Sequence, residues 1–208
     1  MMHVYPPLPL GYSAVAPGQL ANVVTCLEMT SRPPQRSVRG FQPPYDLVRL
    51  EGQDIAAYRA LFQRIGENWM WFSRLTMPDD ELHGILSDAR MELFVLRAGH
   101  DDLGMLELDF REAGQCEIAF FGLVAEAIGK GLGRSLMQAA IDRAWAKPIS
   151  RLWVHTCTFD HPSAVGFYIR SGFRPYAYQV EVQADPRLTG HLPRTAAPHI
   201  PLIEGSPM

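Results

Sequence analysis

Residues 125–137, AEAIGKGLGRSLM, join an apolar run (118–124) to an amphipathic segment (132–145). This order predicts a strand, a glycine-rich turn and a helix. Glycine at alternate positions 129, 131 and 133 permits a tight turn and leaves no Cβ to obstruct a ligand. A helix that begins there points its first unpaired N–H groups and its positive dipole end into the turn. The stretch is therefore a general receptor for phosphate.

Glycine spacing separates the known nucleotide-binding motifs. A P-loop requires GxxxxGK followed by Ser or Thr, but Gly131 follows Lys130 and Val124 occupies the position of the first glycine. A dinucleotide fingerprint requires GxGxxG within an early βαβ unit. Here the third glycine comes one residue early, and the turn lies past the middle of the chain. Spacing thus excludes the P-loop and argues against a nicotinamide enzyme.

Hydrophobic periodicity predicts an α/β fold with an antiparallel meander in the middle of the chain. The expected order is β-α-α-β-β-β-α-β-α-β. Asp160 is the expected N-cap of the last helix and Gly172 its C′ residue. The predicted strands are 47–50, 91–97, 103–110, 117–124, 149–156 and one from 173 with its core at 177–182, and the predicted helices are 53–66, one that opens at 78, 132–145 and 160–171.

The two ends of the chain are rich in proline and glycine and lack the periodicity of the middle. Residues 1–45 form an irregular arm in which 20–29 is expected to add an edge strand. This arm adds that strand, wraps the domain or makes a contact in a homodimer. Residues 46–184 form the main domain, and residues 185–208 are expected to be a tail packed loosely over the surface.

Composition limits the class of protein. Of 208 residues, 47% are hydrophobic and 20% are charged, which is typical of a soluble globular protein. The net charge of -3 without a long basic run argues against a nucleic-acid partner. We expect no signal peptide, because the N-terminus lacks a basic region and an uninterrupted apolar run. We expect no membrane partner, because no apolar run approaches about 20 residues. Cys26, Cys116 and Cys157 are isolated, so we expect reduced, buried thiols in a cytoplasmic protein.

Two motifs resemble those of the GCN5-related N-acetyltransferases, the GNAT family. Residues 128–133, IGKGLG, resemble the pyrophosphate loop of that family, Q/R-x-x-G-x-G/A. Residues 160–173, DHPSAVGFYIRSGF, are similar to its second signature, N-x-x-x-A…Y-x-x-x-G-F. Ile128 stands where Gln or Arg is usual, so Lys130 or Arg134 would supply the charge. Asp160 stands where Asn is common.

The resemblance implies a mixed, mostly antiparallel sheet of six to seven strands flanked by about four helices, from about residue 46 to 182. It also implies acetyl-CoA as cosubstrate, no metal, and direct transfer of the acetyl group to a primary amine, with a small molecule favoured over a protein. The alternative is a non-catalytic CoA-binding or regulatory module on the same fold. The strands that carry Leu123 and His155 would splay apart around the thioester.

The resemblance assigns two kinds of contact with acetyl-CoA to particular residues. Backbone groups of Phe121 and Leu123 would pair with the pantetheine arm as a further strand would. Amides of residues 129–134 would hold the pyrophosphate. The complete set is Phe121, Leu123, Val124, Gly129, Lys130, Gly131, Leu132, Gly133, Arg134, Ser135, Asp160 and Ser163.

Acyl transfer to an amine needs a proton donor for the leaving thiolate and a base for the amine. Tyr168 matches the tyrosine that serves as the donor in the family. Three residues are candidates for the base, Glu117, His155 and Glu107, and a chain of waters without a single base is the alternative. An acid at a strand start is often a solvated edge residue, and a histidine in a strand is often a core residue.

Aromatic residues between the first two predicted helices are candidates for the acceptor site. Trp69, Trp71 and Phe72 fall where the family builds the wall of that site. Aromatic faces there could stack on an apolar or cationic amine. Ordinary core packing explains Trp69 or Trp71 equally well when either is taken singly.

Overall fold

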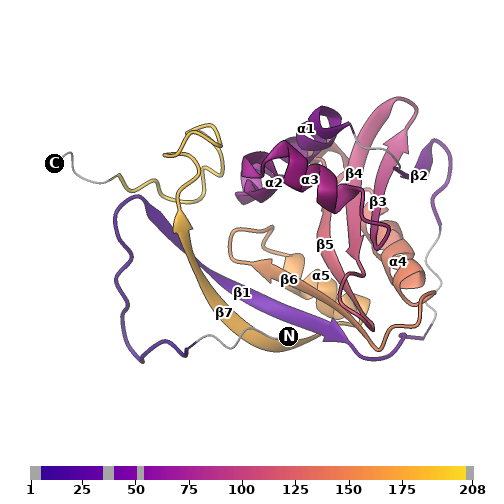
Figure 1. Cartoon of the computed structure of the whole chain (residues 1–208), viewed down its shortest axis with the longest axis horizontal. Helices are drawn as coiled ribbons and strands as arrows, with labels where there is room; N and C mark the ends of the chain where they lie inside the picture. The colour runs from indigo at the N-terminus through magenta and orange to yellow at the C-terminus, as the bar shows by residue number, and fades with distance from the viewer. Residues whose placement is uncertain (1–5, 35–39, 51–53, 205–208) are drawn as a thin grey trace.

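The computed structural model describes residues 6–34, 40–50 and 54–204, and a seven-stranded sheet forms its centre (Figure 1). The strand order is β2-β3-β4-β5-β6-β1-β7, and every neighbouring pair is antiparallel except β5 and β6. The predicted mixed, mostly antiparallel sheet is confirmed. The strands are β1 (Gln19–Met29), β2 (Tyr45–Arg49), β3 (Met91–Ala98), β4 (Asp101–Asp109), β5 (Gln115–Leu123), β6 (Arg151–Cys157) and β7 (Arg174–Ala184).

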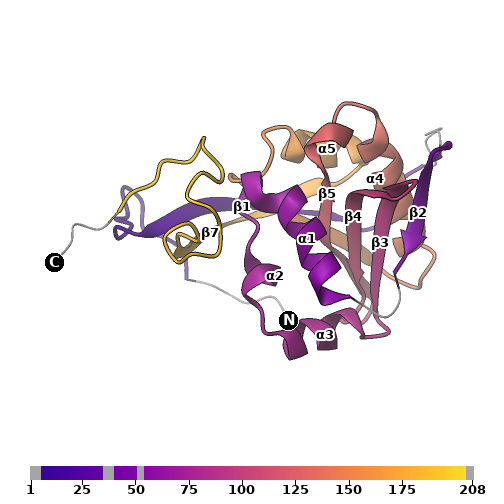
Figure 2. The same cartoon turned by 90° about the horizontal axis from the view of Figure 1, so that it is seen from above.

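Helices cover both faces of the sheet, as Figure 2 shows. On one face lie α1 (Ile55–Gly66), α2 (Ser73–Thr76) and α3 (Asp79–Leu86), and on the other lie α4 (Leu132–Ala144) and α5 (Ala164–Ser171). There are also two short 3-10 helices. The first, η1 (Glu67–Trp69), follows α1, and the second, η2 (Ala125–Ala127), precedes the glycine loop. The sequence did not predict α2, and the predicted helix start at residue 53 lies outside the described residues. None of the described helices is long and apolar enough to cross a membrane.

Two hydrophobic cores lie on the two faces of the sheet. Side chains of successive strand residues point to opposite faces, so each inner strand supplies both cores. Phe94, Leu106 and Ile118 pack against α4 and α5, whereas Val95 and Met105 pack against α1 and α3. The near-continuous apolar runs of β3 and β4 follow from this burial on both sides.

Strand β1 was predicted at an edge, but it lies inside the sheet between β6 and β7. It pairs antiparallel with both neighbours, and β7 is the edge strand instead. Figure 1 shows β1 and β7 continuing together beyond the rest of the sheet as a long ribbon. The inner position could not be predicted because β1 pairs with strands more than 120 residues away. The N-terminal segment therefore places Val24 opposite Cys157 of β6 and Asn22 opposite Glu181 of β7.

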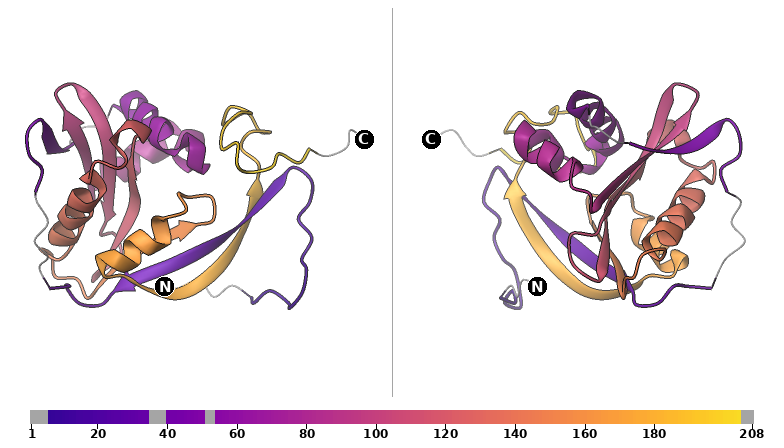
Figure 3. Two further views of the ribbon diagram at one scale, coloured as in Figure 1. Left: turned by 180° about the vertical axis from the view of Figure 1, so that it is seen from behind. Right: turned by 45° about the vertical axis from the view of Figure 1, so that its right-hand side comes forward.

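The first part of the segment after β7 is anchored by buried residues, so the prediction of a loose tail is wrong for residues 185–197. Figure 3 shows it folding back from the end of β7. Arg187 is buried, pairs with Asp185 at 2.7 Å and donates to the carbonyls of residues 196, 200 and 201. Leu192, Ala196 and Ala197 pack with Leu20, Met70 and Phe159. Because one arginine satisfies several carbonyls, a segment without helix or strand can be buried.

Candidate active site

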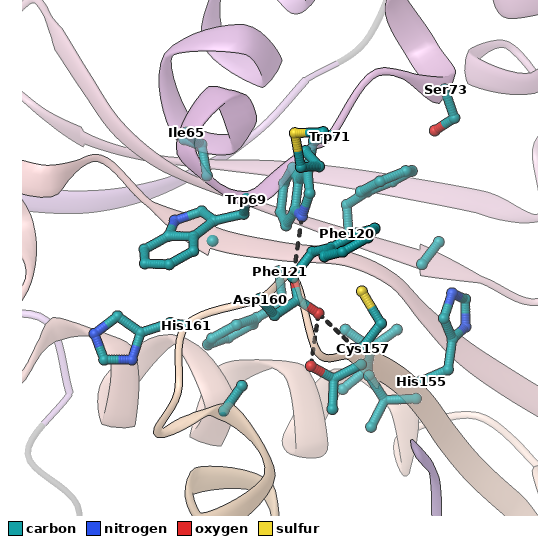
Figure 4. Close-up of a pocket in the computed structure, with 18 of the residues that line it drawn as sticks. Ile65, Trp69, Trp71, Ser73, Phe120, Phe121, His155, Cys157, Asp160 and His161 are labelled. Atoms are coloured by element: carbon teal, nitrogen blue, oxygen red, sulfur yellow. Dashed lines mark hydrogen bonds between the residues drawn. The ribbon is translucent and has the colours of Figure 1, made fainter. Parts of the chain in front are cut away.

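Strands β5 and β6 separate after three paired residues, and a cleft opens between them. The parallel pairing runs from Gln115 opposite Arg151 to Glu117 opposite Trp153. Beyond Glu117, residues 118–123 have no strand partner on the β6 side within the described part of the chain. The cleft has a volume of about 640 Å³ and is also lined by residues 69–74, by α5 and by β1 and β7. Figure 4 shows its central part. The predicted splay is confirmed.

The glycine loop has the geometry of a phosphate receptor. Gly129 and Gly131 have φ of 83° and 80°, and Gly131 is the N-cap of α4. A Cβ at position 129 would meet nothing within 4 Å, so the space in front of the loop is open. Among the described residues, no backbone carbonyl accepts from the N–H groups of residues 129–133. These free amides point to an anion at the start of α4.

Two cations flank this loop. The side chains of Lys130 and Arg134 are exposed, and no described carboxylate lies within 4 Å of either. The N–H of Arg134 donates to the carbonyl of Gly131 at 3.1 Å, so this amide already has a partner, unlike those of residues 129–133. Ile128 is 47% exposed and offers no polar group. The positive charge of the loop therefore comes from Lys130 and Arg134, with Ser135 in the first turn of α4 behind them.

The other predicted cofactor residues differ in whether their side chains line the cleft. Phe121, Leu123 and Gly133 line the cleft. Val124 does not, since its side chain is fully buried and its N–H donates to the carbonyl of Leu103 at 2.9 Å. The side chain of Leu132 packs in the core under α1, so only its backbone faces the loop. Val124 is thus part of the core next to the glycine loop and does not face the cleft.

Asp160 was predicted to cap α5, but Ser163 occupies the N-cap position and its side chain makes no capping bond. The Asp160 carboxylate instead accepts from Thr156 Oγ1 at 2.6 Å, from the N–H of Cys157 at 2.9 Å and from Trp71 Nε1 at 3.2 Å (Figure 4). The chain makes a turn between the end of β6 and the start of α5, so the N-cap of α5 comes after Asp160, at Ser163. Asp160 therefore connects Trp71 to the end of β6 through hydrogen bonds.

Ser163, the other predicted contact of this turn, lines the cleft but is engaged locally. Its hydroxyl lies 2.8 Å from His161 Nδ1, and its N–H donates to the same nitrogen at 3.1 Å. The side chain of His161 in turn contacts the ring of Trp69, with ring centroids 5.2 Å apart. Two contacts, that of Asp160 with Trp71 and that of His161 with Trp69, thus hold the turn after β6 against these tryptophans.

Tyr168 lies on α5 with its side chain in the cleft. It is 7% exposed and packs edge-on against Phe121 and Phe173. Its hydroxyl makes no hydrogen bond with any described residue. Burial raises the pKa of the phenol above its usual value, and the nearby charge of Asp160 adds to this. The hydroxyl therefore stays protonated and is free to donate.

Glu117 and His155 form a pair at the mouth of the splay. His155 Nδ1 lies 3.3 Å from Glu117 Oε1, and both side chains line the cleft. The hydrogen bond to Glu117 raises the pKa of His155, although partial desolvation acts in the opposite direction. The His155 side chain is half exposed, so it can exchange protons with solvent. The pair can accept a proton from a group bound beside it.

Glu107, the third candidate base, does not line the cleft. It is fully buried, accepts from the hydroxyl of Tyr58 and pairs with Arg74 Nη2 at 3.0 Å. A base must reach the proton that it removes. The prediction for Glu107 is therefore wrong. It was misplaced because alternation along β4 does not say which helix covers a given face.

The Glu107–Arg74 pair should be a stability determinant. Glu107→Gln leaves a buried guanidinium without its counter-charge, and we expect the free energy of unfolding to fall by about 3 kcal/mol. Urea unfolding followed by circular dichroism measures this. The control is Glu81→Gln, since Glu81 is exposed on α3 and its loss should change stability by about 0.5 kcal/mol or less. Unchanged stability with lost activity would return Glu107 to the catalytic candidates.

The aromatic wall lies where the sequence predicted it. Trp69, Trp71 and Phe72 all line the cleft. The ring of Trp71 packs on Phe120 with centroids 5.3 Å apart. Between the tryptophans, Met70 has φ of 59° and ψ of 30°, a left-handed conformation that side chains disfavour. Met70 is buried, and it lines the cleft together with both neighbours.

Several polar residues of the cleft were missed by sequence reasoning. Arg74, Asn22 and Glu181 line it, and so does Cys157, which was expected to be buried. Cys157 is half-buried, and desolvation raises its pKa to about 11. Asn22 carried a signal, because it interrupts the apolar positions on the inner face of β1. Glu181 carried none, since its strand alternates like any exposed edge.

Comparison with known proteins gives a family and a fold. The model of the acetyltransferase (GNAT) family matches residues 53–173, more than half of the chain. No curated protein sequence matches the chain. Among solved structures, a GNAT-family protein from Novosphingobium aromaticivorans is 19% identical with a TM-score of 0.54, over 83% of this chain and 69% of that one.

Two further structures are similar. A GCN5-related N-acetyltransferase from Sphaerobacter thermophilus is 13% identical with a TM-score of 0.61, over 81% of this chain but only 52% of its own length. An aminoglycoside acetyltransferase from an uncultured soil metagenomic sample is 18% identical with a TM-score of 0.51, over 62% of this chain and 87% of that one. At these identities the likeness establishes the fold. The chain spans about half to two thirds of the length of several such structures.

Proposed function

Since the chain belongs to the GNAT family of acetyltransferases, we propose that it transfers an acetyl group from acetyl-CoA to a primary amine. The main support is the splay between β5 and β6, which has the glycine loop at one end and the Tyr168 hydroxyl within it. A small molecule is the favoured acceptor, because the cleft is lined on several sides rather than being an open groove.

The residues present fit acetyl-CoA. The amides of residues 129–133, with Lys130 and Arg134, would hold the pyrophosphate. The open edge of β5 at Phe121 and Leu123 offers unpaired backbone groups to the pantetheine amides, as a sheet edge does to an added strand. Because Ile128 offers no polar side chain, binding of the pyrophosphate depends on the backbone and the two cations.

The chemistry needs a neutral amine and a protonated leaving group. The amine nitrogen attacks the thioester carbonyl carbon, the carbon–sulfur bond breaks, and the proton of the amine passes to the His155–Glu117 pair. The Tyr168 hydroxyl gives its proton to the departing thiolate and regains one from solvent. Holding both substrates in one cleft contributes ~7 kcal/mol or more to lowering the barrier.

The His155–Glu117 pair predicts a pH dependence. A base must be unprotonated, so kcat/KM should rise as pH increases through the raised pKa of His155. Glu117→Gln removes the charge that raises this pKa, so the midpoint of the rise should move to lower pH. Profiles of kcat/KM with one fixed amine measure this, because the titration of the amine then cancels in the comparison. A midpoint that stays in place would exclude His155 as the group that titrates.

The proposed activity is tested by two measurements on the wild-type protein. Isothermal titration with acetyl-CoA should show binding, and a thiol-release assay over a panel of amines should show turnover. Binding without turnover on any amine would favour the non-catalytic CoA-binding module. Binding of NAD without binding of CoA would contradict the assignment of the loop.

A further inference from the structure

The acceptor end of the cleft carries carboxylates that no arginine or lysine neutralises. Glu117, Asp160 and Glu181 all line the cleft. Within the described part of the chain, none of the three lies within 4 Å of an arginine or lysine nitrogen. Glu117 contacts the imidazole of His155, with Nδ1 3.3 Å from its Oε1.

The arginines of the cleft are already engaged. Arg74 pairs with Glu107 at 3.0 Å, and Arg111 pairs with Asp109 at 2.6 Å. Both side chains line the cleft but bring their own counter-charge. Trp69, Trp71 and other aromatic side chains line the same cleft as the carboxylates. Carboxylates and aromatic faces together favour an organic cation.

Asn22 and Glu181 form a corner that contains a buried acceptor oxygen without a donor. Asn22 Nδ2 donates to Glu181 Oε2 at 2.9 Å. Because a carboxylate can only accept, the amide nitrogen must face it, and this fixes the orientation of the amide. Asn22 is 3% exposed, and its Oδ1 has no partner among the described residues. A buried acceptor without a donor calls for a ligand that supplies N–H groups.

The corner formed by Asn22 and Glu181 lies far from His155, the candidate base. Asn22 pairs with Glu181, whereas Cys26 pairs with His155, so the two rows are four residues apart along β1. At the rise of a β-strand, this separation is roughly 13 Å. A ligand that reaches both rows must therefore be elongated.

The reaction itself supplies no cation to these carboxylates, whose hydrogen-bond partners are neutral groups and His155. The attacked nitrogen must be neutral, so it brings no positive charge to the far end of the cleft. We propose that the acceptor is an elongated diamine or polyamine, whose far ammonium group binds Glu181 and Asn22 while its near amine reacts beside His155. This inference rests on the proposed acetyl transfer and adds the substrate class.

Matched amines test the proposal. The value of kcat/KM for 1,8-diaminooctane should exceed that for n-octylamine by about tenfold or more, which corresponds to about 1.4 kcal/mol. The short 1,3-diaminopropane should gain no such advantage over n-propylamine, because it cannot reach both rows. Equal values for 1,8-diaminooctane and n-octylamine would overturn the inference while leaving the proposed function in place.

A charge-removing variant locates the second site. Glu181→Gln should lower kcat/KM for 1,8-diaminooctane about tenfold and leave that for n-octylamine within about twofold. Glu81→Gln, the same change on the exposed surface of α3, should alter neither value. An equal loss for both amines in Glu181→Gln would overturn the inference. Absence of turnover with every amine, measured beside acetyl-CoA binding, would overturn the proposed function and this inference with it.

Discussion

Gly131→Glu is expected to abolish acetyl-CoA binding, with a dissociation constant raised at least about 100-fold, or about 2.7 kcal/mol. Gly131 has φ of 80° and is the N-cap of α4. A glutamate there places a carboxylate in front of the amides that would hold the pyrophosphate, and two anions repel in the same site. A side chain at this φ also strains the loop by about 1–2 kcal/mol. Isothermal titration with acetyl-CoA measures the loss.

Two controls separate charge from strain. Gly131→Ala keeps the backbone strain without the carboxylate, so its affinity should fall much less. Gly190→Glu makes the same substitution at the same φ of 80°, with nothing within 4 Å of the new Cβ, in a segment that does not line the cleft. It should leave acetyl-CoA binding unchanged. If Gly131→Glu folds and binds acetyl-CoA as the wild type does, the assignment of the loop is wrong.

The loop could be predicted because its signals are local. The apolar run, the alternate glycines and the amphipathic segment lie within 28 residues of one another, and each forms the expected structure. The strands β3 and β4 were predictable for the same reason, since a hairpin joins neighbours in sequence. Gly172 ends α5 with φ of 109°, as its position after the helix predicted.

The errors share a different physical origin. Placing β1 inside the sheet, burying residues 192–197 and turning Asp160 towards Trp71 all depend on partners far away in the sequence. Glu107 had the residue type of a base, but only the tertiary structure shows Arg74 and Tyr58 beside it. A sequence pattern specifies which face of an element is apolar and leaves open what covers it.

The same reasoning explains why the acceptor end resisted prediction. Asn22, His155 and Glu181 come from three strands, and only the order β6-β1-β7 brings them to one wall of the cleft. The proposed cosubstrate site, by contrast, uses mainly one continuous segment of backbone. Its residues could therefore be predicted from the sequence, whereas those of the proposed acceptor site depend on the order of distant strands.

Tyr168→Phe should lower kcat about 100-fold, the range in which a positioned proton donor contributes. The acetyl-CoA dissociation constant should stay within about threefold, or about 0.7 kcal/mol, because the ring still packs against Phe121 and Phe173. Single-turnover thiol release measures the chemical step, and titration measures binding. Tyr178→Phe is the control, since Tyr178 is 73% exposed and does not line the cleft.

The pH profile gives a second readout for Tyr168. A donor must be protonated, so wild-type activity should fall only when the phenol ionises, and burial raises the pKa of Tyr168 above the usual value near 10. The fall should therefore lie on the alkaline side of that value and vanish in Tyr168→Phe, whose ring cannot ionise. A structural tyrosine would leave this limb unmoved. An unaffected rate in the variant, with an unchanged alkaline limb, would show that the unpartnered hydroxyl serves only to pack α5 against the sheet.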